Sequence, residues 1–275
     1  MNGRNMDVAT ATAGAAATVG VAMRAGEHCG AVFFRHLRKT GGTSVRMLFR
    51  LRSNYTTIPA AEFVTGEWAE RLTHNATFAE AHPRIFVEFH SPFWSDGRYF
   101  LDLLPKLPQL RAAFARRHCD VLAFTVLREP VAQILSDYLA FYDARHNHSV
   151  ASILEWSRQN ADVQVKHLTM RPALPDAESR RAAQDVLNSL DIVGVTEHLD
   201  ELLETLCACC SMRTCGMYHA AAPPLHKAAL SLVDEVAQSE SLRAQLARSA
   251  RVTAQLYSAW RAKWEQLGNR LCNST

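Results

Sequence analysis

The segment from Val121 to Leu127 is a run of seven uncharged, almost entirely apolar residues. A strand of this length and texture is buried on both faces, as in parallel sheets that are covered by helices on each side. Arg128, Glu129 and Pro130 follow it, and apolar residues then recur at helical spacing. Because proline suits the first turn of a helix, the sequence predicts a buried strand, a short turn and a helix.

Similar strand-to-helix steps occur elsewhere in the chain, beginning at residues 31, 85 and 192. Alternating strands and helices predict an α/β fold, here a P-loop-like three-layer arrangement with a central parallel sheet flanked by helices. The 275 residues suffice for one such core. We therefore expect a low-complexity lead-in over residues 1–30 and a single domain over residues 31–270.

The spacing of apolar residues predicts the secondary structure of most of the remaining chain. Helices are expected over residues 100–117, 129–142, 179–190, 197–206 (with Thr196 as N-cap) and 226–267, with a short one near 67–72. The segments on either side of that short helix are expected to be irregular, as is the region from 142 to about 178, which is rich in His and Pro. Such a region suits loops that bind an acceptor substrate.

The first strand leads into a segment with the composition of an anion-binding loop, which reads His36, Leu37, Arg38, Lys39, Thr40, Gly41, Gly42, Thr43, Ser44. Glycines let the backbone approach an anion, and the free N–H groups at a helix start point toward it. Lys39 adds an ammonium group and the hydroxyls add donors. Because the lysine precedes the glycines, the order differs from the G-x-x-x-x-G-K-[ST] loop, which argues against ordinary ATP or GTP hydrolysis. A simple turn is the alternative interpretation.

Arg128 is expected at the carboxyl end of its strand, where open α/β sheets bind ligands. Ser136 lies eight residues further on, just over two helical turns, and is expected to face the same crevice. A structural ion pair is the alternative role for Arg128.

Together the two segments resemble the cofactor motifs of sulfotransferases that use 3'-phosphoadenosine 5'-phosphosulfate (PAPS), above all the carbohydrate branch with heparan sulfate 2-O- and 6-O-sulfotransferases. That family's patterns, H-x-P-K-T-G-G-T-S and R-x-P-x(5)-S-x-Y, match His36 to Ser44 and Arg128 to Tyr138. The resemblance extends from about residue 31 to about 205 and includes the segments 159–164 and 192–200.

The resemblance implies that Arg38 to Ser44 bind the 5'-phosphosulfate of PAPS and that Arg128 and Ser136 bind its 3'-phosphate. Two departures from the family are visible. Arg38 stands where the family usually has proline, and Gln133 stands where many relatives carry a basic residue.

Sulfonyl transfer requires alignment of the reacting groups and neutralisation of charge on the leaving phosphate. Lys39 is the expected source of that neutralisation, and no metal is expected. His90 follows the second strand and is the expected general base, since an imidazole titrates near neutral pH. Glu88 is its rival, because alternate residues of a strand share a face. Weaker candidates are His36, His82, His146 and His148.

A formal net charge of +3 is too small to indicate general nucleic-acid binding. Basic residues gather instead around the first motif, at Arg35, Arg38, Lys39, Arg46, Arg50 and Arg52. This concentration suits a charged nucleotide and an anionic acceptor. With the family resemblance, it favours a glycan, and an anionic polysaccharide in particular.

Seven cysteines include a group at Cys207, Cys209, Cys210 and Cys215. Its spacing is not that of a zinc ribbon, and disulfides, a metal site and inert thiols all stay open. Within a monomer the odd total leaves at least one thiol unpaired.

Four N-x-[ST] sequons, at Asn54, Asn75, Asn147 and Asn273, suggest passage through a secretory lumen. The family resemblance implies a Golgi membrane protein, yet residues 8–23 are only mildly apolar, so any membrane association through them is expected to be weak.

Two other functions remain open at this point. One is a glycan- or nucleotide-binding relative that has lost catalysis, and the other is a P-loop-like small-molecule kinase. The acceptor and the oligomeric state are not specified by the sequence.

Overall fold

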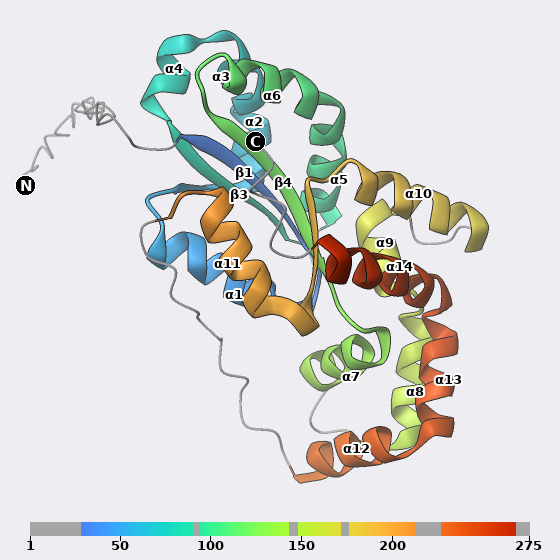
Figure 1. Ribbon diagram of the computed structural model, residues 1–275. Coiled ribbons are helices and arrows are strands. Elements are labelled where there is room, and N and C mark those ends of the chain that lie inside the picture. Colours follow the sequence, from blue (N-terminus) through green and yellow to red (C-terminus); the bar gives the residue numbers. More distant parts are fainter. Residues whose placement is uncertain (1–28, 91–93, 143–147, 172–175, 213–226, 268–275) are drawn as a thin grey trace, which may run out of the picture.

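The computed structural model describes residues 29–90, 94–142, 148–171, 176–212 and 227–267 (Figure 1). Its centre is a parallel sheet of five strands in the order β2-β3-β1-β4-β5. The strands are β1 Gly30–His36, β2 Thr56–Pro59, β3 Arg84–His90, β4 Asp120–Leu127 and β5 Ile192–Val195.

Helices cover both faces of the sheet, with α1 and α11 on one side and α5 and α6 on the other (Figure 1). Their bounds are α1 Gly42–Met47, α2 Ala60–Thr65, α3 Trp68–His74, α4 Ala76–Ala81, α5 Trp94–Leu103, α6 Leu107–Ala115, α7 Pro130–Phe141, α8 Val150–Gln159, α9 Val163–Thr169, α10 Asp176–Asn188, α11 Leu199–Cys209, α12 Lys227–Gln238, α13 Glu240–Ser249 and α14 Arg251–Leu267. A π-helical segment, Leu48–Arg52, continues α1. The expected α/β fold with a central parallel sheet is confirmed.

The sheet owes its stability to strands that are buried on both faces. All seven residues of β1 are buried, and so are the last five of β4. Stacked rings of Phe34 and Phe124, with centroids 4.7 Å apart, join these two strands. The edge strand β2 was not expected from the sequence. Only Ile58 of its four residues is buried, so it lacks the apolar run that marks the other strands.

Several expectations about the helices were wrong. The segments expected to be irregular on either side of residues 67–72 contain β2, α2 and α4, and the helix expected over 226–267 is divided into α12, α13 and α14. The region from 142 to 178 is not irregular, because it contains α8, which starts with a capping box between Ser149 and Ser152, and α9. The expected helix over 100–117 is interrupted by a 3-10 turn at Leu104–Lys106. Thr196 does not cap α11, whose N-cap is His198; Thr196 begins a 3-10 turn, and its hydroxyl bonds elsewhere.

A second apolar cluster lies outside the sheet, among α7, α8, α12 and α13. These helices lie together at the bottom of Figure 1, beyond the end of β4 that leads into α7. The expectation of a single domain over residues 31–270 stays a prediction, and most of the expected lead-in, residues 1–28, is outside the described residues. No helix in the described ranges combines the length and apolarity needed to span a bilayer. The expected Golgi location has no support in the structure.

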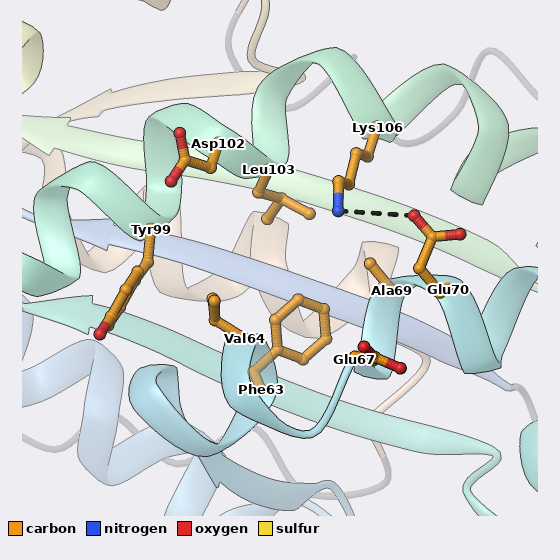
Figure 2. Close-up of a pocket in the computed structure, with 9 residues that line it drawn as sticks. All are labelled: Phe63, Val64, Glu67, Ala69, Glu70, Tyr99, Asp102, Leu103 and Lys106. Atoms are coloured by element: carbon orange, nitrogen blue, oxygen red, sulfur yellow. Dashed lines mark ion pairs between the residues drawn. The ribbon is translucent and has the colours of Figure 1, made fainter.

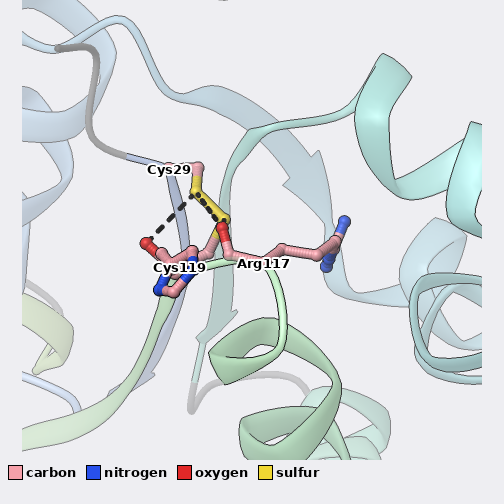
Figure 3. Close-up of a disulfide and its surroundings, with 4 residues drawn as sticks. Cys29, Arg117 and Cys119 are labelled. Atoms are coloured by element: carbon pink, nitrogen blue, oxygen red, sulfur yellow. Dashed lines mark hydrogen bonds between the residues drawn. A yellow bond between two sulfur atoms is a disulfide. The ribbon is translucent and has the colours of Figure 1, made fainter. Parts of the chain in front are cut away.

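The amino ends of β1 and β4 are joined by a disulfide between Cys29 and Cys119 (Figure 3). These cysteines immediately precede Gly30 and Asp120, which are register partners in the sheet. Cys207 and Cys209 each take part in a disulfide, whereas Cys210 is a buried free thiol. Among the alternatives for the cysteine group, the described residues therefore show disulfides at Cys207 and Cys209 and a free thiol at Cys210. Cys215 and Cys272 lie outside the described residues.

Candidate active site

The strand order fixes where a ligand would bind. From the central strand β1 the chain runs to β2 and β3 on one side and then crosses to β4 and β5 on the other. The connections therefore diverge at the carboxyl end of β1, and ligands of open α/β sheets bind at such a switch point. The residues that follow β1, β3, β4 and β5 meet there.

The loop between β1 and α1 is tightly shaped. Lys39 and Gly41 both adopt positive φ angles, of 62° and 85°. A left-handed conformation is costly for lysine, and such backbone strain concentrates at functional sites. At Gly42 a methyl group would lie 2.0 Å from Cδ2 of His36, so only glycine fits without a shift of that ring.

Two threonines hold this loop from inside. The fully buried Thr40 donates its hydroxyl to Leu37 O at 2.9 Å. The hydroxyl of Thr196, after β5, lies 2.9 Å from Thr40 O and 3.1 Å from Leu127 O at the end of β4. The Thr40 hydroxyl thus serves the loop itself, while Thr196 links the loop to the neighbouring strand.

The second motif contacts the first directly. Arg128 Nη1 donates to the carbonyl of Lys39 at 3.0 Å. The backbone of Arg128 is itself held by the Gln164 amide, which accepts from its N–H at 3.0 Å and donates to its carbonyl at 2.9 Å. Gln164 lies on α9, so the segment 159–164 noted in the sequence supports the motif that contains Arg128.

The two motifs create a concentration of positive charge. Arg38 is paired with Asp137 of α7 at 2.6 Å, but neither Lys39 nor Arg128 forms an ion pair within the described part of the chain. Burial and the neighbouring Arg128 lower the pKa of Lys39. Burial lowers the pKa of Arg128 as well. An anion that accepted hydrogen bonds from both groups would relieve this repulsion.

At the end of β3, Glu88 is the hub of a second network. Its Oε1 lies 2.5 Å from Nδ1 of His36, and Arg46 of α1 donates to both carboxylate oxygens at 2.7 Å. Burial alone would raise the pKa of Glu88, but the hydrogen bonds from His36 and Arg46 outweigh it and lower the pKa to about 2. Glu88 is therefore a carboxylate fixed between two donors.

His90 lies beside this network, with its ring centroid 4.3 Å from that of His36. Burial, and then the proximity of His36, lower its pKa to about 4, so the imidazole is neutral at pH 7. The expectation that this imidazole titrates near neutral pH was therefore wrong, because the sequence does not show its burial. His90 lines a cavity of about 640 Å³ together with residues of α1, the π-helical segment after it, β2, β3 and α5, which include Arg46, Arg50, Thr57, Glu88 and Asp96. A neutral imidazole at the wall of a polar cavity can accept a proton.

The ligating atoms of His36, Glu88 and His90 lie within 4.8 Å of one another, a grouping that metal ions use. Both oxygens of Glu88 already accept from Arg46, however. The guanidinium places a positive charge beside the position that a metal ion would take.

The remaining candidates are spread more widely. Thr43 is exposed at the start of α1, the buried Ser44 donates its N–H to Gly41 O, and Ser136 is half-buried on α7. His82 packs against Trp68 and Phe78. His148 packs against Tyr138, and His146 lies outside the described residues. None of the contacts found for His82 or His148 involves the loop at Lys39.

Sequence reasoning missed two participants, Asp137, which pairs with Arg38, and His167 on α9; Arg46 was noted only as one of the basic residues near the first motif. Burial, and then the charges of Arg38 and Arg35, lower the pKa of His167 to about 3. No local pattern marks Asp137 or His167, since each meets the site only through the fold.

A separate cavity of about 310 Å³ lies among α2, α3 and α5 (Figure 2). Its rim carries Glu67, Glu70, Asp102 and Lys106, and the lysine is paired with Glu70 at 3.5 Å. With carboxylates in excess at its rim, this cavity does not suit an anionic ligand.

No family model and no curated protein sequence matches this chain. Among solved structures, it is similar to a sulfotransferase from Alicyclobacillus acidocaldarius, with 16% identity and a TM-score of 0.39 over 84% of this chain and 98% of that one. A TM-score this low carries no argument about fold or function.

Proposed function

We propose that this protein is a PAPS-dependent sulfotransferase that moves a sulfonate group to a hydroxyl of a glycan. The observation that carries the proposal is the hydrogen bond from Arg128 to the carbonyl of Lys39. It means that the two motifs resembling the cofactor-binding sequences lie on one edge of the sheet, where Lys39 and Arg128 form no ion pair within the described residues. PAPS carries phosphate groups at both ends of its ribose, and two adjacent cationic groups suit such a ligand.

In the proposed reaction the acceptor oxygen forms a bond to sulfur while the bond from sulfur to the phosphate oxygen breaks. The electron pair leaves with the phosphate, whose growing charge Lys39 neutralises. The proton of the acceptor hydroxyl passes to an imidazole. Fixed cations that require no reorganisation are an effective way to stabilise such a transition state.

We assign the role of base to His90 rather than Glu88. Glu88 accepts three hydrogen bonds from His36 and Arg46, so both of its carboxylate oxygens are already occupied by donors. His90 is neutral at pH 7 and lines the cavity. Glu88 then orients its neighbours, and replacing His90 by Asn should remove turnover while leaving PAPS binding intact.

The cavity supports an anionic acceptor. Arg46 and Arg50 contribute two guanidinium groups to its wall, while Thr57 offers a hydroxyl. Arg50 is exposed and Arg46 retains partial exposure, so a carboxylate or sulfate of a polysaccharide would be within reach of both.

The test is transfer of labelled sulfonate from PAPS to a panel of polysaccharides, with Lys39→Ala as the blank and Lys106→Ala as a matched lysine control from the other cavity. We expect transfer to at least one anionic polysaccharide, strongly reduced by Lys39→Ala and unchanged by Lys106→Ala. Calorimetric binding of desulfonated cofactor without any transfer would identify a binding module that has lost catalysis. Magnesium-dependent ATP turnover would identify a kinase, and absence of both binding and transfer would reject the proposal.

A further inference from the structure

Arg35 lies in β1, directly before His36, and its side chain is completely buried. Arginine is among the residues least often found in a protein interior, because removing its charge from water is costly. Burial lowers its pKa to about 10, against the opposing influence of Asp96. The side chain therefore stays charged at neutral pH, inside the core beside the candidate site.

The guanidinium of Arg35 connects three elements. Nη1 donates to the carbonyl of Phe89 at 3.0 Å, Nη2 donates to the carbonyl of His167, and Nη2 also lies 3.3 Å from Sδ of Met170. Phe89 is the residue directly before His90 on β3, and His167 lies on α9. One side chain from the central strand thus fixes the backbone at two of the site's imidazoles.

The packing around this side chain leaves no room for another arrangement. A methyl group added at Gly97 of α5 would lie 2.1 Å from Sδ of Met170 and 2.8 Å from Nη2 of Arg35. The helix α5 therefore packs directly on the guanidinium and on the methionine that it touches. Arg35 has one position, and the backbone groups bonded to it are held accordingly.

We propose that Arg35 is the positioning residue of this site, which holds His90 and His167 in place at the carboxyl end of β1. Stability alone does not account for a buried arginine, because apolar replacement of buried charged groups is often neutral or even stabilising. A requirement for fixed imidazoles does account for it, since catalytic groups must be held to within a fraction of an ångström. The catalytic part of this inference rests on the function proposed above.

The charge of Arg35 has a second consequence. After burial itself, the positive groups around His90 lower its pKa, and Arg35 is one of them; Arg35 acts in the same direction on His36 and His167. The charged and titratable groups that face His90 are Arg35 and His36 from β1, Arg46 from α1, Glu88 from β3, Asp96 from α5 and His167 from α9. Removal of the Arg35 charge should therefore raise the pKa of His90.

Two substitutions separate the bonds from the charge. Arg35→Lys keeps the charge but cannot bridge both carbonyls, whereas Arg35→Met removes charge and bonds together. The matched control is Arg84→Lys, since Arg84 is also buried but lies at the opposite end of the neighbouring strand β3, where it donates to Asn54.

The first measurement needs no substrate. NMR signals of the imidazole rings, assigned through His90→Asn and His167→Asn, are followed in the full chain as pH is varied. We expect the NMR signals of both rings to shift in each Arg35 variant. Neither signal should shift in Arg84→Lys. The pKa of His90 should rise in Arg35→Met, which removes the positive charge, and stay unchanged in Arg35→Lys, which keeps it. Unmoved rings in both Arg35 variants would overturn the proposal whatever reaction the protein catalyses.

The second measurement is kinetic. Both Arg35 variants should lose on the order of 10²-fold in kcat, with the affinity for PAPS unchanged. Full kcat in Arg35→Met would overturn the positioning role, while shifted rings in a protein without transfer activity would reject only the proposed function. Where a variant fails to fold in thermal melts, Gly97→Ala serves instead, because it displaces the guanidinium and keeps its charge. The same ring shifts are expected, and their absence counts against the proposal.

Discussion

At their amino ends, β1 and β4 are joined covalently by the disulfide of Cys29 and Cys119, in surroundings that also bury the thiol of Cys210. At their carboxyl ends the same two strands lead into Lys39 and Arg128. The guanidinium of Arg128 donates to the backbone carbonyl of Lys39, and its charge lowers the pKa of the lysine. The amino end of the sheet is thus cross-linked by a covalent bond, whereas the carboxyl end brings together positively charged groups that repel one another.

The contrast shows that the two ends of one sheet have different roles, since one end stabilises the fold and the other holds the groups expected to bind a ligand. A cross-link between residues far apart in the sequence stabilises the fold chiefly by restricting the unfolded chain. Neighbouring cations and strained loop residues lower stability, and proteins retain them where a ligand needs them. Substitutions at the amino end should therefore change stability alone, and those at Lys39 should change activity alone.

The largest expected effect lies at the amino end. Cys29 and Cys119 are 90 residues apart in sequence. The chain-entropy relation then predicts that the substitution of both by Ser lowers the free energy of unfolding by about 4.6 kcal/mol. Urea denaturation measures this loss, and the transfer rate of the folded variant should equal that of the parent. A variant that stays folded but loses activity would break the separation between the two ends.

The next effect lies at the carboxyl end. Lys39→Ala should lower the transfer rate under saturating PAPS on the order of 10²–10³-fold, because a preorganised cation is lost at the leaving group. Its free energy of unfolding should stay the same or rise slightly, since the lysine is repelled by Arg128 and its pKa is already lowered. Single-turnover rates and urea denaturation of one preparation give both values. A loss of folding free energy as large as the loss of transition-state stabilisation would contradict the separation between the two ends of the sheet.

Glu88 is an exception that sharpens the contrast, because it stabilises the carboxyl end. Its pKa is lowered from 4.5 to about 2 in the folded protein, so its ionised form contributes stability above pH 4.5 that is lost as pH falls toward 2. Glu88→Gln leaves Arg46 without its partner and should cost roughly 3 kcal/mol at pH 7. The difference between variant and parent should shrink below pH 4.5. A difference that is constant with pH would mean that packing, and not charge, explains the loss.

The sequence predicted the fold wherever an element carried its own signal. The strands β1, β3, β4 and β5 are marked by apolar runs, and all four were expected at nearly their observed bounds. The edge strand β2 was missed because a single pairing with β3 creates it, and its residues show no run of this kind. The helix α8 was missed because its start depends on a cap made by two serines.

The residues of the candidate site were also predicted only where the sequence carries a local signal. The segments around Lys39, Glu88 with His90, and Arg128 follow three strands, and parallel strands bring such segments together at one edge. The partners of these residues come from elsewhere. Asp137 meets Arg38 across 99 residues and His167 meets Arg35 across 132, contacts that only the packing of α7 and α9 against the loop creates. No spacing in the sequence specifies them.

The smallest expected effect tests how the loop at Lys39 is held. Thr196→Val removes the hydroxyl that lies against the carbonyls of Thr40 and Leu127 and leaves the size of the side chain almost unchanged. One hydrogen bond contributes about 1 kcal/mol, so the affinity for PAPS should fall by about fivefold, with kcat nearly unchanged because Lys39 is retained. Thr73→Val is the control, since its hydroxyl donates within α3 to Ala69 and lies in another part of the chain. Calorimetry with the desulfonated cofactor measures both variants. Equal affinities in Thr196→Val and Thr73→Val would mean that the loop keeps its shape without this link, and that the strain at Lys39 is supported by Gly41 and the Thr40 hydroxyl instead.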